Sequence, residues 1–186
     1  IPIEANRGET LTFKNESDVP LYVTLEWEGI PKRSKIEPVQ SKLTLETCYY
    51  NEAGDEIDIT RVKQGESFYA VFRVDQEKPK QNISELALVQ VLPAGWEIEN
   101  LRLLGGQLPD WCDDYKFGLE NYADIRDDRI MWFFDMSSYA GCYDFLVKIN
   151  AVTVGEFYLP PTLLEAMYNN DYKVTTEGVN VEVVTR

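Results

Sequence analysis

The amino-acid sequence predicts an all-β protein folded as an antiparallel β-sandwich, and three observations support this prediction. Short apolar segments recur along the chain, and several alternate apolar with polar residues, which is the period of a half-buried strand. Clusters of turn-forming residues separate these segments at near-regular spacing. Helical periodicity is almost absent. We expect about seven strands after residue 40, with a short helical turn near the C-terminus.

Residues 1–34 are expected to form a strand pair and a linker. Two alternating segments lie within residues 10–28, on either side of turn-forming residues 15–18. A polar, basic stretch at residues 29–35 then separates them from the rest of the chain. Two strands cannot hold a core alone, so this part reads as the tail of a preceding domain. Residues 35–186 are predicted to form the sandwich.

The strands of the sandwich follow one another with turn signals between them. The segment at residues 68–74 is apolar on both faces, which predicts a buried strand. Residues 101–125 show no clear period, and a long connection of this kind is usually functional or mobile. The predicted strands are residues 43–50, 68–74, 86–92, 129–134, 142–152 and 179–184.

A corner at residues 154–168 organises the end of the chain. A strand stops at Pro160 and Pro161, which have no backbone N–H to donate to a sheet. Pro161 suits the first position of a helix, so a short helical turn is expected to follow and to display Met167 and Tyr168. From their spacing alone, these two side chains are more readily core residues than an anchor for a partner.

Composition excludes several classes of function. The chain of 186 residues has a net charge of −14, which argues against nucleic acid and against an anionic membrane surface as partners. No apolar run of about 18 residues is present, so we expect no membrane span. Histidine is absent, which removes Ser-His-Asp and Cys-His catalysis and His-ligated zinc. We expect neither an enzyme nor a bound cofactor.

The three cysteines lie outside any C-x-x-C pair, which makes a structural zinc site a poor fit. Cys112 and Cys142 could form a disulfide in an oxidising compartment, worth about 3–4 kcal/mol in the chain-entropy model. Two unpaired buried thiols are an equal alternative. Cys48 is expected to be a small core residue.

An acidic cluster at Asp124–Asp128 is the best candidate for an ion site. Carboxylates could bind calcium, but the spacing departs from a calcium loop and Arg126 lies inside the cluster. A charged turn with surface Arg–Asp pairs before a buried strand is the favoured interpretation. No pair of carboxylates can be singled out for glycoside hydrolysis.

Several motifs resemble the C-terminal end of bacterial alpha-2-macroglobulins, in that family's order. They are Tyr49-Tyr50 before Gly54, Val62–Gly65, Leu92–Asn100, Asp124–Arg129, and the corner from Gly155 to Tyr168. The resemblance implies a last macroglobulin-like β-sandwich, with residues 1–34 as a CUB-like remnant. It also implies a periplasmic or cell-envelope protein that traps proteases through a buried Cys–Gln thioester on another domain.

In that family a Cys is followed two residues later by Glu-Gln, and no cysteine of this chain fits this pattern. The resemblance therefore implies that this chain shields a thioester and does not form one. A tyrosine of the terminal domain covers the thioester in such proteins, and here it corresponds to Tyr168, with Met167 beside it and Tyr172 as the alternative. The implied partners are the thioester domain and neighbouring macroglobulin-like domains of the same chain, and indirectly proteases.

A carbohydrate-binding or adhesin-type β-sandwich is the alternative from another class. Outward-facing aromatics such as Tyr22, Tyr50 and Tyr69 fit it, although they could equally face a neighbouring domain. An exposed row of Trp or Tyr with a calcium site would favour this alternative. An exposed Tyr168 beside an apolar patch would favour the macroglobulin-like interpretation.

Overall fold

The computed structural model describes residues 10, 12–26, 37–78, 80–99, 108–117, 119–139 and 141–186. The chain divides into two compact units, Ile1–Ser34 and Lys35–Arg186. In the first unit, residues 12–26 contain a turn at Asn15–Val19 but no strand, so the predicted strand pair is not formed there. The Asn15 side chain closes this turn by accepting from Ser17 N and donating to the Val19 carbonyl. The rest of the predicted pair lies outside the described residues.

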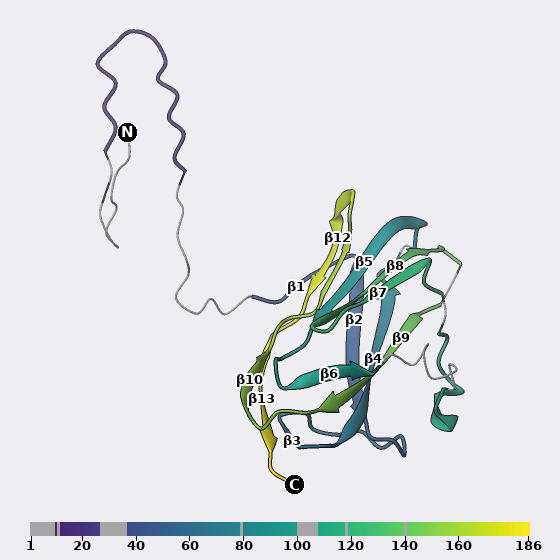
Figure 1. Ribbon diagram of the computed structural model, residues 1–186. Helices are drawn as coiled ribbons and strands as arrows, with labels where there is room; N and C mark the ends of the chain where they lie inside the picture. The colour runs from purple at the N-terminus through teal and green to yellow at the C-terminus, as the bar shows by residue number, and fades with distance from the viewer. Residues whose placement is uncertain are drawn as a thin grey trace. The chain divides into compact units, whose positions relative to one another are not determined.

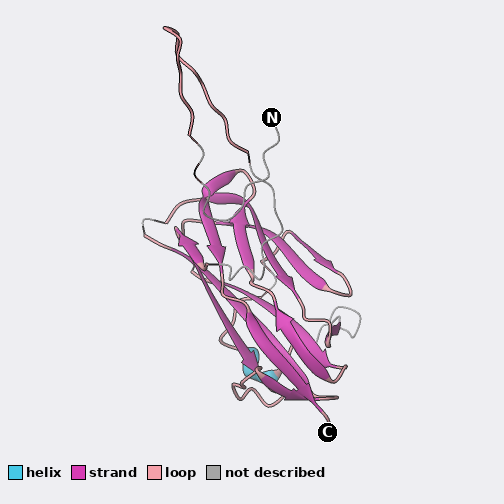
Figure 2. Ribbon diagram, turned by 90° about the vertical axis from the view of Figure 1, so that its left-hand side faces the viewer, coloured by secondary structure: helices cyan, strands magenta, loops and turns pink. Residues whose placement is uncertain are grey.

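The second unit is a β-sandwich whose described strands form three sheets, drawn as magenta arrows in Figure 2. The six-stranded sheet has the order β1 (Val39–Ser41), β12 (Asn169–Thr175), β11 (Leu163–Ala166), β5 (Ile83–Val91), β8 (Arg129–Met136) and β7 (Tyr122–Ile125). The four-stranded sheet has the order β2 (Leu43–Tyr50), β4 (Ser67–Gln76), β9 (Tyr143–Ala151) and β6 (Trp96–Glu99). The three-stranded sheet has the order β10 (Gly155–Leu159), β13 (Val179–Val184) and β3 (Arg61–Lys63).

Aromatic side chains from the two larger sheets meet in one core. Trp132 of β8 lies 5.4 Å from both Phe72 of β4 and Phe145 of β9, measured between ring centroids. Phe134 of β8 lies 4.7 Å from Phe145. These rings are almost fully buried, and burial of aromatic side chains is a large source of stability. The predicted fold class, an antiparallel β-sandwich, is confirmed, although β13 pairs in parallel with β3.

The predicted helical turn after the double proline is wrong, because residues 163–166 form the strand β11. Leu164 and Ala166 point into the core, while Leu163 and Glu165 are half-buried. β11 lies between β5 and β12 and pairs with both. Ladder hydrogen bonds on two sides outweigh the local preference of Pro161 for a helix start. A single-turn 3-10 helix at Asp110–Cys112 is the helical element among the described residues.

Residues 108–117 cover the outer face of the four-stranded sheet. Trp111 packs against Tyr50 and Tyr69, with ring centroids 5.0 Å and 5.6 Å away. The Tyr115 hydroxyl donates to the Tyr50 hydroxyl at 3.0 Å. The outward-facing Tyr50 and Tyr69 therefore contact a later segment of their own chain. Part of the long connection without sequence periodicity is thus packed as a strap over the sheet.

Candidate functional site

The candidate site is the tip of the β11–β12 hairpin, which projects at the upper end of the sandwich in Figure 1, away from β3. Ala166 pairs with Asn169, so Met167 and Tyr168 form a two-residue turn. The side chain of Tyr168 is 86% exposed and that of Met167 is 41% exposed. The register also shifts beside the turn, because Glu165 pairs with Lys173. Residues 170–172 of β12 consequently have no partner in β11.

The sheet holds the hairpin tip from both sides. On the β5 side, the Met167 N–H donates to the Glu85 carbonyl at 2.9 Å. On the other side, the Ser41 hydroxyl donates to the Asp171 carbonyl at 2.7 Å, and Lys42 Nζ donates to the Asp171 carboxylate at 2.5 Å. The hydrogen bond that Lys42 donates to this carboxylate raises the pKa of Lys42. The tip therefore presents its two apolar side chains on a supported frame.

The three sequence-predicted residues occupy two different environments. Tyr172 is 7% exposed, and its hydroxyl donates to the Gln81 side-chain oxygen at 3.2 Å. The ring also lies under Lys42 Nζ, 5.2 Å from its centroid. Tyr172 therefore belongs to the core beneath the tip. Met167 and Tyr168 face outward, contrary to the burial that their spacing alone favoured.

The double proline is the point at which the chain changes sheets. β10 ends at Leu159 in the three-stranded sheet, and β11 begins at Leu163 in the six-stranded one. The buried Gln90 side chain donates to the Pro160 carbonyl at 3.2 Å and accepts from the Thr162 hydroxyl. Backbone groups that lose ladder partners at the corner thus find partners in the core. This corner fixes the direction in which β11 leaves toward the tip.

The three cysteines of the chain are not joined by a disulfide in the structure. Cys48, Cys112 and Cys142 are all free thiols. Cys112 follows Trp111, which packs on Tyr69 near the start of β4, whereas Cys142 precedes Tyr143, which pairs with Val74. Tyr69 and Val74 are separated by about 16 Å along a strand, at about 3.3 Å per residue. The two cysteines are thus next to residues that contact different parts of β4.

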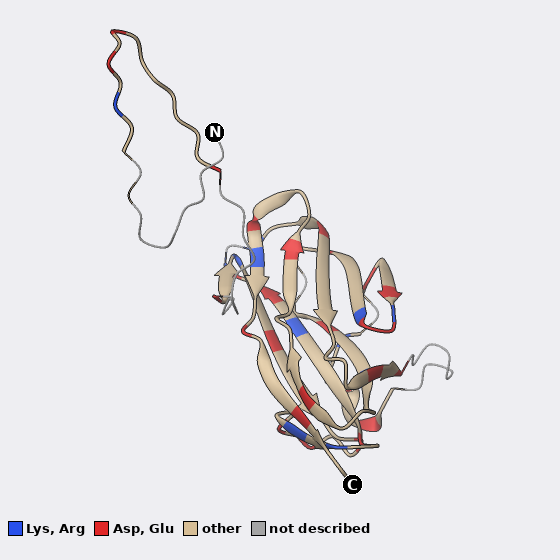
Figure 3. Cartoon of the chain, turned by 60° about the vertical axis from the view of Figure 1, so that its left-hand side comes forward, with Lys and Arg blue, Asp and Glu red and all other residues tan. Residues whose placement is uncertain are grey.

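The acidic cluster at Asp124–Asp128 forms the β7–β8 turn and is internally paired. Arg126 donates to the Asp124 carboxylate at 2.8 Å, and Arg129 donates to that of Asp128 at 2.6 Å. Within the described part of the chain, no group of three or more Asp, Glu, Cys or His side chains could hold a metal ion. Acidic residues are spread over strands and turns of the sandwich in Figure 3. The described segments also contain no helix long and apolar enough to cross a membrane.

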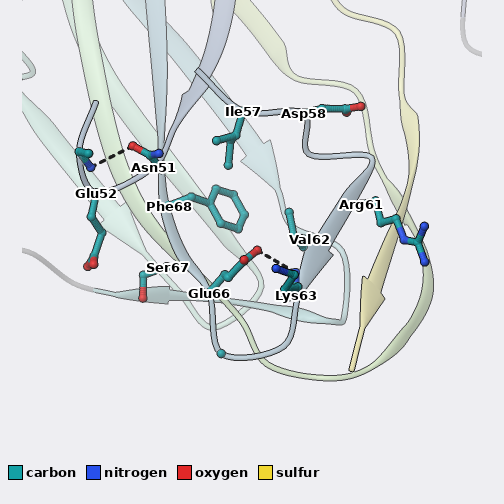
Figure 4. A pocket seen from close by; sticks show the side chains of 12 residues that line it. Asn51, Glu52, Ile57, Asp58, Arg61, Val62, Lys63, Glu66, Ser67 and Phe68 are labelled. Atoms are coloured by element: carbon teal, nitrogen blue, oxygen red, sulfur yellow. Dashed lines mark hydrogen bonds between the residues drawn. The ribbon is translucent and has the colours of Figure 1, made fainter. Parts of the chain in front are cut away.

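An open depression of about 710 Å³ lies beside β3 (Figure 4), at the other end of the sandwich from the hairpin tip in Figure 1. Its wall includes Arg61, Val62 and Lys63 of β3, together with the fully buried Phe68. The Glu66 carboxylate accepts from the Lys63 N–H at 2.8 Å. Charged and apolar groups are mixed here, so the depression has no set of converging groups that define a ligand.

Sequence reasoning missed the strap at residues 108–117. Trp111, Tyr115 and Phe117 are three aromatics within seven residues, and this clustering was the available signal. The described tryptophans do not form an exposed row, because Trp96 and Trp132 are buried and Trp111 packs on the sheet. An exposed row of tryptophans, which would have favoured a carbohydrate-binding sandwich, is therefore missing among the described residues.

The fold of the sandwich and its projecting hairpin is similar to that of solved alpha-2-macroglobulin structures. A native fragment of Escherichia coli alpha-2-macroglobulin, spanning domain MG7 to the C-terminus, superposes with a TM-score of 0.68 at 20% identity. That match covers 84% of this chain and 25% of the fragment. A tyrosine-to-glycine mutant of Salmonella alpha-2-macroglobulin gives 0.68 at 23% identity, over 81% of this chain and 10% of that one. Salmonella alpha-2-macroglobulin reacted with methylamine gives 0.67 at 23% identity, with the same coverage.

The family itself follows from the sequence comparisons. Residues 43–171 match the family described as the bacterial alpha-2-macroglobulin MG10 domain, and the chain belongs to this family. An alpha-2-macroglobulin of Xylella fastidiosa (strain 9a5c) is 32% identical over 166 residues, which cover 84% of this chain and 10% of that protein. Alpha-2-macroglobulin of Escherichia coli (strain K12) is 22% identical over 184 residues, which cover 94% of this chain and 11% of that protein. The chain thus spans about a tenth of the length of these relatives.

Proposed function

We propose that this domain shields a thioester carried by another domain of the same full-length protein, which traps proteases outside the cytoplasm, in the periplasm or cell envelope. The observation that carries the proposal is the exposed Tyr168, displayed with Met167 at the tip of a supported hairpin. Large apolar side chains at such a position typically anchor an interface. The chain itself lacks the Cys-x-Glu-Gln motif, so its contribution is protective. Residues 1–34 are proposed to complete a preceding CUB-like domain.

The chemistry of a thioester explains what Tyr168 contributes. A thioester persists in water only where nucleophiles are kept from its carbonyl carbon. An aromatic ring laid over the group removes water from one side, and a phenol can also donate one hydrogen bond to the carbonyl oxygen. Met167 is unbranched and flexible, so it can fill the remaining gap beside the ring. Cleavage of the protein by a protease would withdraw the hairpin and expose the thioester to the attacking enzyme.

The test compares Tyr168→Ala, Tyr168→Phe and the unaltered full-length protein by the rate at which methylamine releases a free thiol. We expect Tyr168→Ala to raise this rate at least tenfold, because both the ring and its hydrogen bond are lost. Tyr168→Phe keeps the ring, so its rate should rise only by the roughly 2–12-fold that the loss of one hydrogen bond predicts.

Tyr122→Ala provides the matched control. Tyr122 is 61% exposed on the edge strand β7, three strands away from β11 in the same sheet. Its removal should leave the rate unchanged. An unchanged rate in Tyr168→Ala, or an unaltered protein that releases no thiol with methylamine, would contradict the proposed function.

A further inference from the structure

Two residues of the sandwich adopt a backbone conformation that side chains disfavour. Among the described non-glycine residues, Lys42 and Glu85 alone have positive φ, at 56° and 59°. In this left-handed region the Cβ atom crowds the backbone, and such residues concentrate where function requires a fixed geometry. Both residues contact the β11–β12 hairpin, although they come from different parts of the chain.

Glu85 connects the hairpin turn to β8 through its backbone. Its carbonyl accepts from the Met167 N–H at 2.9 Å, and its own N–H donates to the Asp135 carboxylate at 2.8 Å. The second oxygen of Asp135 accepts from the Asn121 side-chain amide at 3.0 Å. The β5–β8 register shifts between Ile83 and Leu86, so Glu85 lies in a bulge. The left-handed conformation of Glu85 occurs within this bulge, and both of its backbone hydrogen bonds are made in that conformation.

Lys42 supports the opposite side of the hairpin. It lies between β1 and β2, and its carbonyl accepts from the Glu77 N–H at 3.0 Å. Its ammonium group bonds the Asp171 carboxylate and lies over the ring of Tyr172. Asp171 and Tyr172 belong to the part of β12 that has no partner in β11. Lys42 thus braces the segment that the hairpin's own ladder leaves unsupported.

We propose that Glu85 and Lys42 are positioning residues: the carbonyl of Glu85, set by its left-handed backbone, and the ammonium group of Lys42 hold the β11–β12 hairpin so that Tyr168 is presented in one orientation. This inference rests on the proposed function of Tyr168. A tip that moved freely would lose conformational entropy on docking and would cover its target only part of the time. The bonds from Glu85 and Lys42 to the two sides of the tip remove this freedom before docking.

The test uses substitutions at Glu85 that differ in backbone preference but remove the same charge. Glu85→Asn tolerates the left-handed region, whereas the β-branched valine of Glu85→Val does not. In the full-length protein we expect Glu85→Val to raise the rate of thiol release by methylamine at least fivefold, and Glu85→Asn to stay within twofold of the unaltered rate. Amide hydrogen exchange over residues 163–175 should become faster in Glu85→Val alone.

Gly65→Val controls for a general loss of stability. Gly65 has a φ of 83°, and an added Cβ there meets no atom within 4 Å, so valine imposes the same backbone strain without a clash. Gly65 belongs to the β3–β4 turn beside the depression, at the end remote from the tip. This variant should lower the melting temperature as Glu85→Val does, yet leave both the methylamine rate and exchange over residues 163–175 unchanged.

The outcomes separate the two proposals. If Tyr168→Ala accelerates thiol release and Glu85→Val does not, the positioning role is wrong while the shielding role stands. If Tyr168→Ala has no effect, the shielding role fails. In that case, hydrogen exchange over residues 163–175 still tests whether Glu85 orders the hairpin. Unchanged exchange in Glu85→Val would then contradict the positioning role too.

Discussion

The side chain of Asp144 shows how one buried charge ties the strap to the sheet. Its carboxylate is fully buried and accepts from Arg73 Nε at 2.7 Å and Nη2 at 3.3 Å. It also accepts from the Lys116 N–H at 3.0 Å. Donation to the Asp144 carboxylate raises the pKa of Arg73, whose guanidinium lies 4.9 Å from the centre of the Tyr115 ring. Three N–H donors, two on Arg73 of β4 and one on Lys116 of the strap, therefore depend on one carboxylate.

Asp144→Ala should lower the free energy of unfolding by about 3 kcal/mol, measured by urea denaturation. Removing one partner of a buried ion pair costs about 3–5 kcal/mol, and the 39% exposure of Arg73 places the effect at the lower end. The exposed pair of Asp128 and Arg129 offers the matched control. Asp128→Ala should leave the free energy of unfolding unchanged within error, because solvent screens such pairs. Equal losses in the two variants would show that burial of Asp144 is unimportant.

The thiol of Cys112 should resist alkylation in the folded protein. Burial, and secondarily the nearby charge of Asp113, raises its pKa to about 11. Because the thiolate is the nucleophile, iodoacetamide at pH 8 should leave Cys112 unmodified, and its labelling rate should increase as the pH approaches 11. Mass spectrometry of the labelled protein measures both. In urea without reductant all three cysteines should be labelled, whereas only one label would reveal a disulfide and contradict the free thiols.

The strand change between β10 and β11 depends on the buried contact between Thr162 and Gln90. Thr162 is 4% exposed and Gln90 is 2% exposed. Thr162→Val keeps the shape of the side chain but removes the hydroxyl that donates to Gln90. We expect the free energy of unfolding to fall by about 1–3 kcal/mol, the cost of an unsatisfied buried polar group. Urea denaturation measures the change.

Thr175→Val is the control for this substitution, because Thr175 is only partly buried on β12. It should change the free energy of unfolding by less than about 0.5 kcal/mol, as is usual for surface positions. A similar loss in both variants would mean that the Gln90 contact does not hold the corner.

The corner also shows what sequence can and cannot specify about an element. Pro160 and Pro161 correctly predicted where a strand ends, because a missing N–H has the same consequence in any fold. The state of residues 163–166 could not be predicted in this way. Four apolar-rich residues fit either a helix start or a strand, and pairing with β5 and β12 decides between them. Those partners come from distant parts of the chain.

The exposure of Met167 and Tyr168 at the hairpin tip likewise could not be predicted from the local sequence pattern. Spacing favoured burial of Met167 and Tyr168, because most large apolar residues in a strand-rich chain lie in the core. The two-residue turn carries them past the end of the sheet, and only Tyr172 remains inside. The strap at residues 108–117 was not predicted from the sequence for a related reason. Its contacts are between rings, so no period of two or of 3.6 marks it.

The whole chain combines a self-sufficient sandwich with a first unit whose described residues bury nothing. The core draws its side chains from Leu43 to Val183. In contrast, residues 12–26 are all exposed, including Leu21 and Leu25 at 56% and 62%. Two isolated arms cannot form a stable sheet, which explains why the predicted strands are not formed there. The alternating apolar and polar residues of these segments are typical of strands that pair with a larger sheet.

Deleting residues 1–34 should therefore leave the sandwich intact. We expect residues 35–186 to unfold cooperatively, with a melting temperature within about 2 °C of that of residues 1–186, because a change of 1 kcal/mol shifts a domain of this size by about 2–4 °C. Differential scanning calorimetry of the two proteins measures this. A fall of more than about 5 °C, beyond the shift from 1 kcal/mol, would mean that the first unit stabilises the second. Equal melting temperatures would instead support a role for residues 1–34 in a neighbouring domain, whose sheet their exposed apolar side chains would join.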